Sequence, residues 1–245
     1  MEHSCIMDAD SFIYSTVAKA QFENPCEGHE GEMISEWPVV RHMFDEKVRL
    51  LKAKLKVDNI QMFISGDDNF RYTIFPNYKA NRQSIIRPMH LNTLKDYCEH
   101  TYNAIRANGA EADDYTVWYA LKNPKALVCA IDKDIKHQVP NKVYDYWKEE
   151  FCKTDKSKLD FNFYLQVIIG DSSDNIKGAP GIGPKKALKF ISEDMTEVEL
   201  QLGTLRAYES VGLSLKEAEL SARLVRMDQF NPETSKLELF NFSLI

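Results

Sequence analysis

Three short apolar runs in this sequence each end at or just before an aspartate. The runs cover residues 5–7, 61–65 and 126–131, and the aspartates are Asp8, Asp67 and Asp132. Runs of this length are typical of buried parallel strands. Apolar residues recur at helical spacing within 40–55, and residues 112–121 follow a glycine with acids in the first turn. The alternation of strand and helix predicts an open α/β sheet.

Ligands of such sheets bind beyond the carboxyl ends of the strands, so we expect these aspartates at one edge. Further acids follow at three other places, and together they give nine carboxylates: Asp8, Asp67, Glu111, Asp113, Asp114, Asp132, Asp134, Asp171 and Asp174. If the fold gathers them, their mutual repulsion is costly without cations. Oxygen ligands suit Mg²⁺ or Mn²⁺, and the scarcity of paired Cys and His disfavours zinc. Two such cations can support phosphodiester hydrolysis.

Each acidic group also has a simpler interpretation. Acids in the first turn of a helix interact favourably with its dipole, which would explain the group at Glu111. Asp171 and Asp174 can be capping or turn residues, and Asp67 can belong to an ordinary turn. Asp132 and Asp134 share one side only if the extended path continues past the strand. The joint occurrence of these acids beside predicted strand ends favours a shared metal site.

Basic residues are concentrated in one part of this acidic chain. The formal net charge is −6, and it becomes positive once the nine acids are set aside. Residues 71–106 contain six Lys or Arg residues and two acids. We expect this segment, including Arg71, to contact nucleic acid. Within this stretch, Tyr78 can stack on a base while Lys79 and Arg82 clamp a phosphate. A solvated loop is the alternative.

A glycine turn follows the last acids: Gly181, Gly183, Lys185 and Lys186. Pro184 stands where a phosphate-binding P-loop has its lysine, which excludes that motif. A glycine turn into a helix exposes backbone N–H groups to a DNA phosphate, and the lysines add charge. An ordinary corner between two helices is the alternative.

The remaining features set the broad class of the protein. No apolar stretch reaches the ~18 residues of a membrane span, and the N-terminus lacks a secretory pattern, so we expect a cytoplasmic protein (host cytoplasm if the source is viral). Five scattered cysteines predict reduced thiols. We expect an exposed loop at 20–38, a lysine-rich helix at 185–191, broken helices at 198–226 and a terminal strand at 236–245. Two domains are expected, 1–160 and 161–245.

Taken in order, these motifs resemble the flap endonuclease/5′ nuclease superfamily, and they are most similar to compact bacterial and bacteriophage 5′→3′ exonucleases. The match covers roughly residues 5 to 192. The resemblance implies a PIN-like α/β core, a helix-three-turn-helix DNA-binding element and two metal ions. It implies one metal group of Asp8, Asp67, Glu111, Asp113 and Asp114, and a second of Asp132, Asp134, Asp171 and Asp174. Lys79 and Arg82 match the catalytic basic pair at the scissile phosphate, Tyr78 matches an aromatic that stacks on a terminal base, and the glycine turn matches an element that grips duplex DNA, often through K⁺.

The function implied is a Mg²⁺-dependent 5′→3′ exonuclease or flap endonuclease. It would act as a monomer on DNA with 5′ ends, nicks, gaps or flaps, and also on RNA–DNA hybrid, leaving 5′-phosphate and 3′-hydroxyl. A structure-selective DNA-binding protein without turnover and a PIN-type ribonuclease are the alternatives. The sequence departs from the family at the helical arch. Only residues 79–110 are available for it and Pro88 interrupts them, so we expect a short arch.

Overall fold

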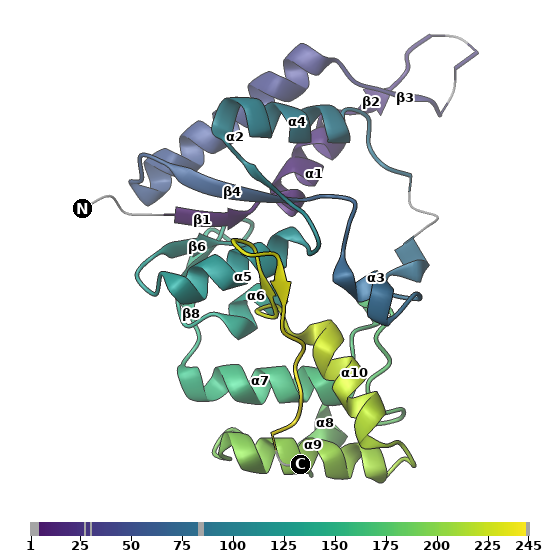
Figure 1. Ribbon diagram of the computed structural model, residues 1–245. Helices are drawn as coiled ribbons and strands as arrows, with labels where there is room; N and C mark the ends of the chain where they lie inside the picture. The colour runs from purple at the N-terminus through teal and green to yellow at the C-terminus, as the bar shows by residue number, and fades with distance from the viewer. Residues whose placement is uncertain (1–4, 27, 30, 83–85, 244–245) are drawn as a thin grey trace.

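A six-stranded sheet forms the centre of the molecule (Figure 1). The structure is a computed structural model that describes residues 5–26, 28–29, 31–82 and 86–243. In spatial order the strands are β5 (Ile105–Ala107), β4 (Ile60–Ser65), β1 (Cys5–Asp8), β6 (Leu127–Cys129), β7 (Lys142–Asp145) and β8 (Glu150–Lys153). Every neighbouring pair is parallel except β7 and β8, which are antiparallel. The predicted α/β class is confirmed.

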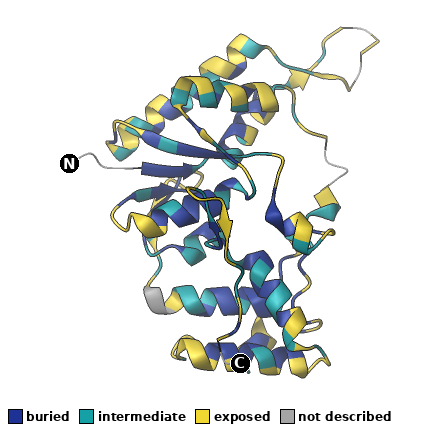
Figure 2. Cartoon of the chain, in the orientation of Figure 1, coloured by how far each residue is buried: buried dark blue, intermediate teal, exposed yellow. Residues whose placement is uncertain are grey.

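The central strands are buried on both faces, which explains why they read as continuous apolar runs. Met7 and Ile64 pack into the core on one face, while Ile6 and Phe63 pack into a separate core on the other. Figure 2 shows β1 and β4 largely in the colour of buried residues. The predicted strands at 5–7, 61–65 and 126–131 are therefore confirmed, although β6 is shorter than its run.

Helices cover both faces of the sheet. One face carries α1 (Asp10–Lys19), α2 (Trp37–Leu55) and α4 (Leu91–Tyr102), and the other carries α5 (Ala112–Lys122) and α6 (Lys133–Gln138) (Figure 1). Val40, Phe44, Val48 and Leu51 form the buried stripe of α2, as their spacing predicts. In the part of the chain that the structure describes, no helix combines the length and apolar character needed to cross a membrane.

The C-terminal part is mostly helical, as predicted. It contains α7 (Lys156–Ile169), the 3₁₀ turn η2 (Ser172–Asp174), α8 (Pro184–Ala187), α9 (Glu197–Glu209) and α10 (Leu215–Val225). The expected domain boundary at residue 160 falls inside α7, which packs against α6 of the sheet layer and against α9. Phe230 in β9 (Phe230–Asn231) returns to the sheet layer and stacks on Tyr115, with ring centroids 6.0 Å apart. The division into two domains stays a prediction.

Three local predictions need correction. The expected loop at 20–38 contains a small exposed antiparallel pair, β2 (Phe22–Glu23) and β3 (Met33–Ile34). The lysine-rich helix is limited to α8. The terminal strand is limited to β10 (Lys236–Leu237), because Phe242 turns into the core between the C-terminal helices, and residues 244–245 lie outside the described residues.

The segment between Tyr78 and Glu111 belongs mostly to the core. It contains η1 (Ala80–Arg82), then α4, which packs against α1 and β4, and then β5, which pairs with β4. The part left for an arch lies between η1 and α4, and residues 83–85 of it lie outside the described residues.

Candidate active site

The carboxyl edge of the sheet brings several predicted acids together. Asp8 ends β1, Asp132 follows β6 as the N-cap of α6, and Glu111 follows β5 as the N-cap of α5. Burial raises the pKa of Asp8 to about 8, and the nearby carboxylates of Asp10 and Asp132 add to the rise. The parallel register of the strands therefore places acids from separate parts of the sequence close enough to repel one another.

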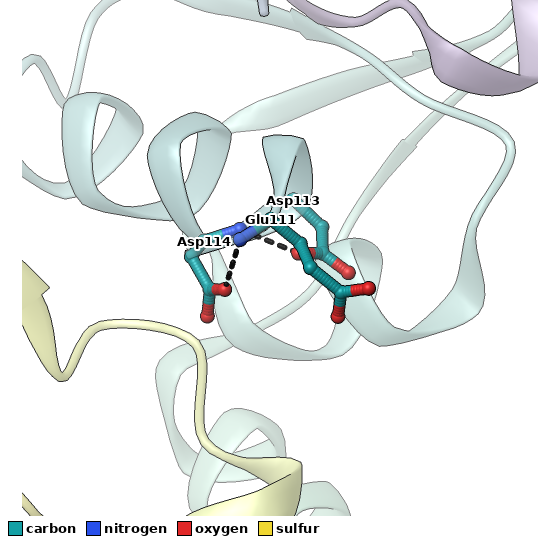
Figure 3. A group of neighbouring side chains, drawn as sticks. All are labelled: Glu111, Asp113 and Asp114. Atoms are coloured by element: carbon teal, nitrogen blue, oxygen red, sulfur yellow. Dashed lines mark hydrogen bonds between the residues drawn. The ribbon is translucent and has the colours of Figure 1, made fainter. Parts of the chain in front are cut away.

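Glu111, Asp113 and Asp114 form an acidic cluster at the start of α5 (Figure 3). Each offers a carboxylate oxygen, and these oxygens lie within 4.8 Å of one another. Asp114 Oδ2 accepts a hydrogen bond from the Glu111 N–H at 2.9 Å, so the helix-capping interpretation also holds. Burial raises the pKa of Asp113 well above its usual value, and its acidic neighbours raise it further. The cluster is thus both a helix cap and a group of carboxylates that repel one another.

Arg71 lies inside the protein, which corrects the prediction that it contacts DNA. Its side chain is 1% exposed, and its guanidinium donates to both oxygens of Asp114 at 2.6 and 2.7 Å. It also donates to the backbone carbonyls of Leu224 and Arg226, at the end of α10. Arg71 and Asp114 therefore tie α3 (Phe70–Ile74), α5 and the end of α10 together.

Lys79 links two acidic groups from different elements. Its Nζ lies 2.5 Å from Glu111 Oε1 and 3.8 Å from Asp174 Oδ2. Arg82 reaches the same Asp174, with its Nη2 2.5 Å from Oδ1. Burial lowers the pKa of Lys79, but the carboxylates of Glu111, Asp113 and Asp174 outweigh it and raise the pKa to about 12. Lys79 is therefore charged throughout the physiological range.

Tyr78 is buried beneath this pair. Its ring is 3% exposed, and its hydroxyl lies 2.8 Å from Glu111 Oε2 and 3.0 Å from Asp174 Oδ2. Burial raises the pKa of this hydroxyl far above its usual value, so it remains a hydrogen-bond donor. In this structure the ring presents no open face to a base, and the stacking role of Tyr78 stays a prediction.

A second acidic group lies around Asp132, Asp134 and Asp171. Asp132 Oδ1 accepts the backbone N–H of Asp134 at 2.7 Å, so the chain turns into α6. The extended path that would put Asp132 and Asp134 on one side of a strand is therefore absent here. Burial raises the pKa of Asp134 to about 6, with further increases from Asp132 and Asp171. Among the described residues, Asp134 Oδ1 is buried and accepts no hydrogen bond. A buried carboxylate oxygen of this kind needs a partner.

Two glycines shape the loop that carries Asp171 and Asp174. Gly170 has φ +74°, and a Cβ there would lie 2.3 Å from the carbonyl oxygen of Ile176. Gly178 has φ +60° and is equally close to the backbone of Gly170. Only glycine permits this close approach of the two chain segments. The tight loop fixes the positions of both acids relative to Arg82 and Lys133, whose Nζ lies 3.2 Å from Asp171.

Other predicted residues lie outside this network. Asp67 sits exposed on the bend after β4, and in the described part of the chain it has no hydrogen bond or ion pair with another predicted acid. The glycine turn lies with the C-terminal helices, where Gly183 caps α8 and Lys186 Nζ donates to the carbonyl of Gly181 at 2.9 Å. A Cβ at Gly181 or Gly183 would meet nothing within 4 Å.

Asp10 belongs to the site but was missed by the sequence reading. Its carboxylate accepts the backbone N–H of Ser65, at the end of β4, and lies 2.9 Å from Lys95 Nζ. Its repulsion raises the pKa of Asp8. The available signal was the position of Asp10 two residues after Asp8, directly beyond a strand end.

Some known proteins are similar to this chain in sequence, and others are similar in fold. The chain is 27% identical over 204 residues to the 5′-3′ exonuclease of Buchnera aphidicola subsp. Schizaphis graminum, which covers 77% of this chain and 69% of that protein. It is 26% identical over 211 residues to flap endonuclease Xni of Shewanella pealeana, with 78% and 82% covered. No protein-family model matches the chain.

Among solved structures, the flap endonuclease of bacteriophage T5, in a pseudo-enzyme–product complex with DNA and metal ions, has the same fold. The TM-score is 0.69 at 15% identity, over 92% of this chain and 89% of that one. The fold is thus that of an α/β protein whose acids meet at the carboxyl edge of a mostly parallel sheet. The chain is therefore similar in sequence to 5′-3′ exonucleases and flap endonucleases, and it shares the fold of the bacteriophage T5 flap endonuclease.

Proposed function

We propose that this protein is a divalent-metal-dependent 5′→3′ exonuclease and flap endonuclease that hydrolyses DNA near 5′ ends, nicks, gaps or flaps. The observation that carries the proposal is the contact of Lys79 with Glu111 and Asp174. It brings a largely buried cation between two acids that are distant in the sequence, at the edge of the sheet where ligands bind. The products would be a 5′-phosphate and a 3′-hydroxyl.

The side chains fit Mg²⁺ or Mn²⁺. Asp8 and Asp113 have raised pKa values, and Asp134 has a buried oxygen that accepts no hydrogen bond within the described chain. These are carboxylates that a hard cation would satisfy, and oxygen-only ligands suit Mg²⁺. When bound, two such ions lower the pKa of a water molecule and offset charge on the phosphoryl group.

We propose that the metal ligands fall into two groups. The first contains Asp8, Glu111 and Asp113, and the second contains Asp132, Asp134, Asp171 and Asp174. Asp67 would join the first group from its exposed bend. Asp114 is an exception, because both of its oxygens are bound by Arg71, and we propose that it supports the cluster rather than binding metal.

Lys79 and Arg82 would contact the scissile phosphate. Both already bind carboxylate oxygens in this structure, and Arg82 remains 46% exposed. Phosphate oxygens are ligands of the same kind, so a phosphate that enters the site can replace the acids as the partner of these cations. Charges fixed in this way stabilise the negative charge that grows on the phosphoryl group.

We further propose that residues 161–245 grip duplex DNA through a helix-three-turn-helix element, while residues 1–160 form a PIN-like nuclease core. Open space around Gly181 and Gly183 supports this, because a DNA backbone can approach the turn closely. Lys185 and Lys186 add positive charge beside it. The Gly181 carbonyl already accepts a hydrogen bond from Lys186, so K⁺ binding there would compete with that ammonium group.

Cleavage assays on labelled flap DNA, nicked DNA, RNA–DNA hybrid and single-stranded RNA test the function. The unaltered protein should release 5′-phosphorylated products from DNA in Mg²⁺ and none in EDTA. Asp132→Asn should abolish this turnover, whereas Asp58→Asn, at an exposed turn before β4, should not. Tight DNA binding without turnover, or cleavage of RNA alone, would refute the proposal.

A further inference from the structure

A groove of about 670 Å³ lies beside the candidate active site. It runs along α1 and is lined by Tyr14, Lys19, Arg82, Lys95 and Trp147, among others. Its volume is in the range of pockets that hold small organic ligands. Asp10, which also lines it, and Arg82 belong to the network of the site, so the groove opens directly from the place where the phosphate is proposed to bind.

Trp147 is an exposed aromatic ring on a rigid support. It is 63% exposed, whereas Trp118 is 9% exposed. The turn between β7 and β8 holds it, because Asp145 Oδ1 accepts the backbone N–H groups of Trp147 and Lys148 at 2.9 Å each. Lys136 in turn binds the other oxygen of Asp145. Because these bonds fix the backbone of the turn, less conformational freedom is lost when a flat ligand stacks on the indole.

The same turn reaches into the acidic site. Tyr146, next to Trp147, packs its ring against Phe12 and places its hydroxyl beneath the surface, near the charges of Asp8 and Asp132. Among the described residues, this buried hydroxyl has no hydrogen-bond partner. The turn therefore connects the acids, on its inner side, with an exposed indole on its outer side.

The groove combines aromatic rings with cations. Tyr14 is 42% exposed, and Lys19 Nζ lies 5.3 Å from the centroid of the Trp147 ring. Among the described residues that line the groove, Lys19, Arg82 and Lys95 are cations and Asp10 is the one carboxylate; Arg82 also pairs with Asp174 outside the lining. Exposed rings that alternate with Lys and Arg bind single-stranded nucleic acid, because the rings stack on unpaired bases and the cations meet phosphates. Duplex bases are already stacked on one another and offer no such faces.

We infer that this groove binds the unpaired nucleotides of the substrate next to the scissile phosphate, with Trp147 stacking on a base and Lys19 facing the phosphate backbone. This inference rests on the proposed function. It assigns base stacking to the exposed Trp147 in addition to any role of the buried Tyr78. It also predicts that the enzyme distinguishes substrates that carry an unpaired 5′ strand from those that do not.

Binding of a fluorescein-labelled oligothymidylate in EDTA, followed by anisotropy, tests the site without turnover. Trp147→Ala should weaken binding about tenfold, the expected effect of losing one stacked base. Trp147→Phe keeps an aromatic ring and should retain most of the affinity. Phe151→Ala is the matched control, because Phe151 is 48% exposed on the same hairpin and has Lys142 3.9 Å from its ring centroid, but it lies outside the groove.

Steady-state cleavage of a flap substrate adds a second readout. Trp147→Ala should raise KM for the flap several-fold with little change in kcat, and Trp147→Phe should restore KM. Equal binding by Trp147→Ala and the unaltered protein, or equal loss in Phe151→Ala, would overturn the inference. Cleavage of nicked DNA by the unaltered protein is measured alongside, because nicked DNA carries no unpaired 5′ strand. If the unaltered protein fails to cleave nicked DNA, the proposed function is refuted, whereas a normal rate leaves the groove to be judged by Trp147→Ala.

Discussion

The guanidinium of Arg71 and the carboxylate of Asp114 form a bidentate ion pair at 2.6 and 2.7 Å, with neither side chain more than 1% exposed. The pair joins α3 to the helix that carries the acidic cluster. Asp114 has its charge balanced by Arg71, whereas Asp113, one residue earlier, has a pKa well above its usual value because of burial and acidic neighbours. Adjacent acids of one cluster thus differ in role: Asp114 forms a structural ion pair, and Asp113 remains available to a metal ion.

The first prediction concerns this pair. Asp114→Asn leaves the Arg71 charge buried without its partner, so the free energy of unfolding should fall by about 3–5 kcal/mol. Asp113→Asn relieves repulsion and should not destabilise the protein. Urea unfolding of both variants in EDTA measures the difference. Unchanged stability in Asp114→Asn would mean that its main role is metal binding.

Replacing Lys79 tests the link between the acidic groups. Lys79→Ala should lower kcat by about 10²–10³-fold, the usual cost of removing a group that stabilises charge in the transition state. The pKa of Glu111, which Lys79 and Arg71 hold below its usual value against the effect of burial, should rise in the variant. Single-turnover cleavage of flap DNA measures the rate, and Lys125→Ala, an exposed lysine before β6, is the control. Equal rates in the two variants would exclude the proposed role.

Protonation of Asp8 predicts how stability depends on pH. Its pKa is raised from 3.8 to about 8 in the folded protein, mainly by burial and then by Asp10 and Asp132. The folded state therefore binds this proton more tightly than the unfolded state, and the contribution of Asp8 to the stability of the metal-free protein should be lost as pH rises from about 4 to about 8. Thermal unfolding in EDTA across this range measures the effect.

The matched variant is Asp8→Asn, which should make this pH dependence weaker. Mg²⁺ binds the folded state and the carboxylate form, so saturating Mg²⁺ should raise the melting temperature, and the rise should be largest near pH 8. An identical pH dependence of the melting temperature in EDTA for Asp8→Asn and the unaltered protein would contradict the assignment.

The sequence predicted the elements that depend on local pattern. Residues 5–7 and 61–65 are mostly apolar on both faces because the strands are buried on both faces. This pattern can be recognised in the sequence without knowing which strands are adjacent. Their carboxyl ends then had to meet at one edge of a parallel sheet. The positions of Asp8 and Asp132 could therefore be predicted from the strand ends alone.

Contacts between distant segments were beyond that reasoning. Arg71 stands in a basic stretch, and only the packing of α3 on α5 makes it the partner of Asp114. The sequence predicts an exposed aromatic ring at Tyr78. In the structure the η2 loop covers this ring, and the Tyr78 hydroxyl donates a hydrogen bond to Asp174. Asp132 and Asp134 lie at the start of a helix. Asp132 caps this helix through the backbone N–H of Asp134, and the cap is favoured over a continued strand.

The glycines of the C-terminal part separate structural from functional roles. Gly170→Ala should place a Cβ against the Ile176 carbonyl at a φ of +74°, so it should destabilise the protein by at least about 1–3 kcal/mol and displace Asp171 and Asp174. Gly183 is a helix cap in extended backbone with open space around it, so Gly183→Ala should leave the free energy of unfolding nearly unchanged. It should instead weaken binding to duplex DNA, because the added methyl group stands where the DNA backbone is proposed to approach. Chemical unfolding and duplex binding in EDTA measure both effects, and duplex affinity in Gly183→Ala equal to that of the unaltered protein would exclude this turn as a contact.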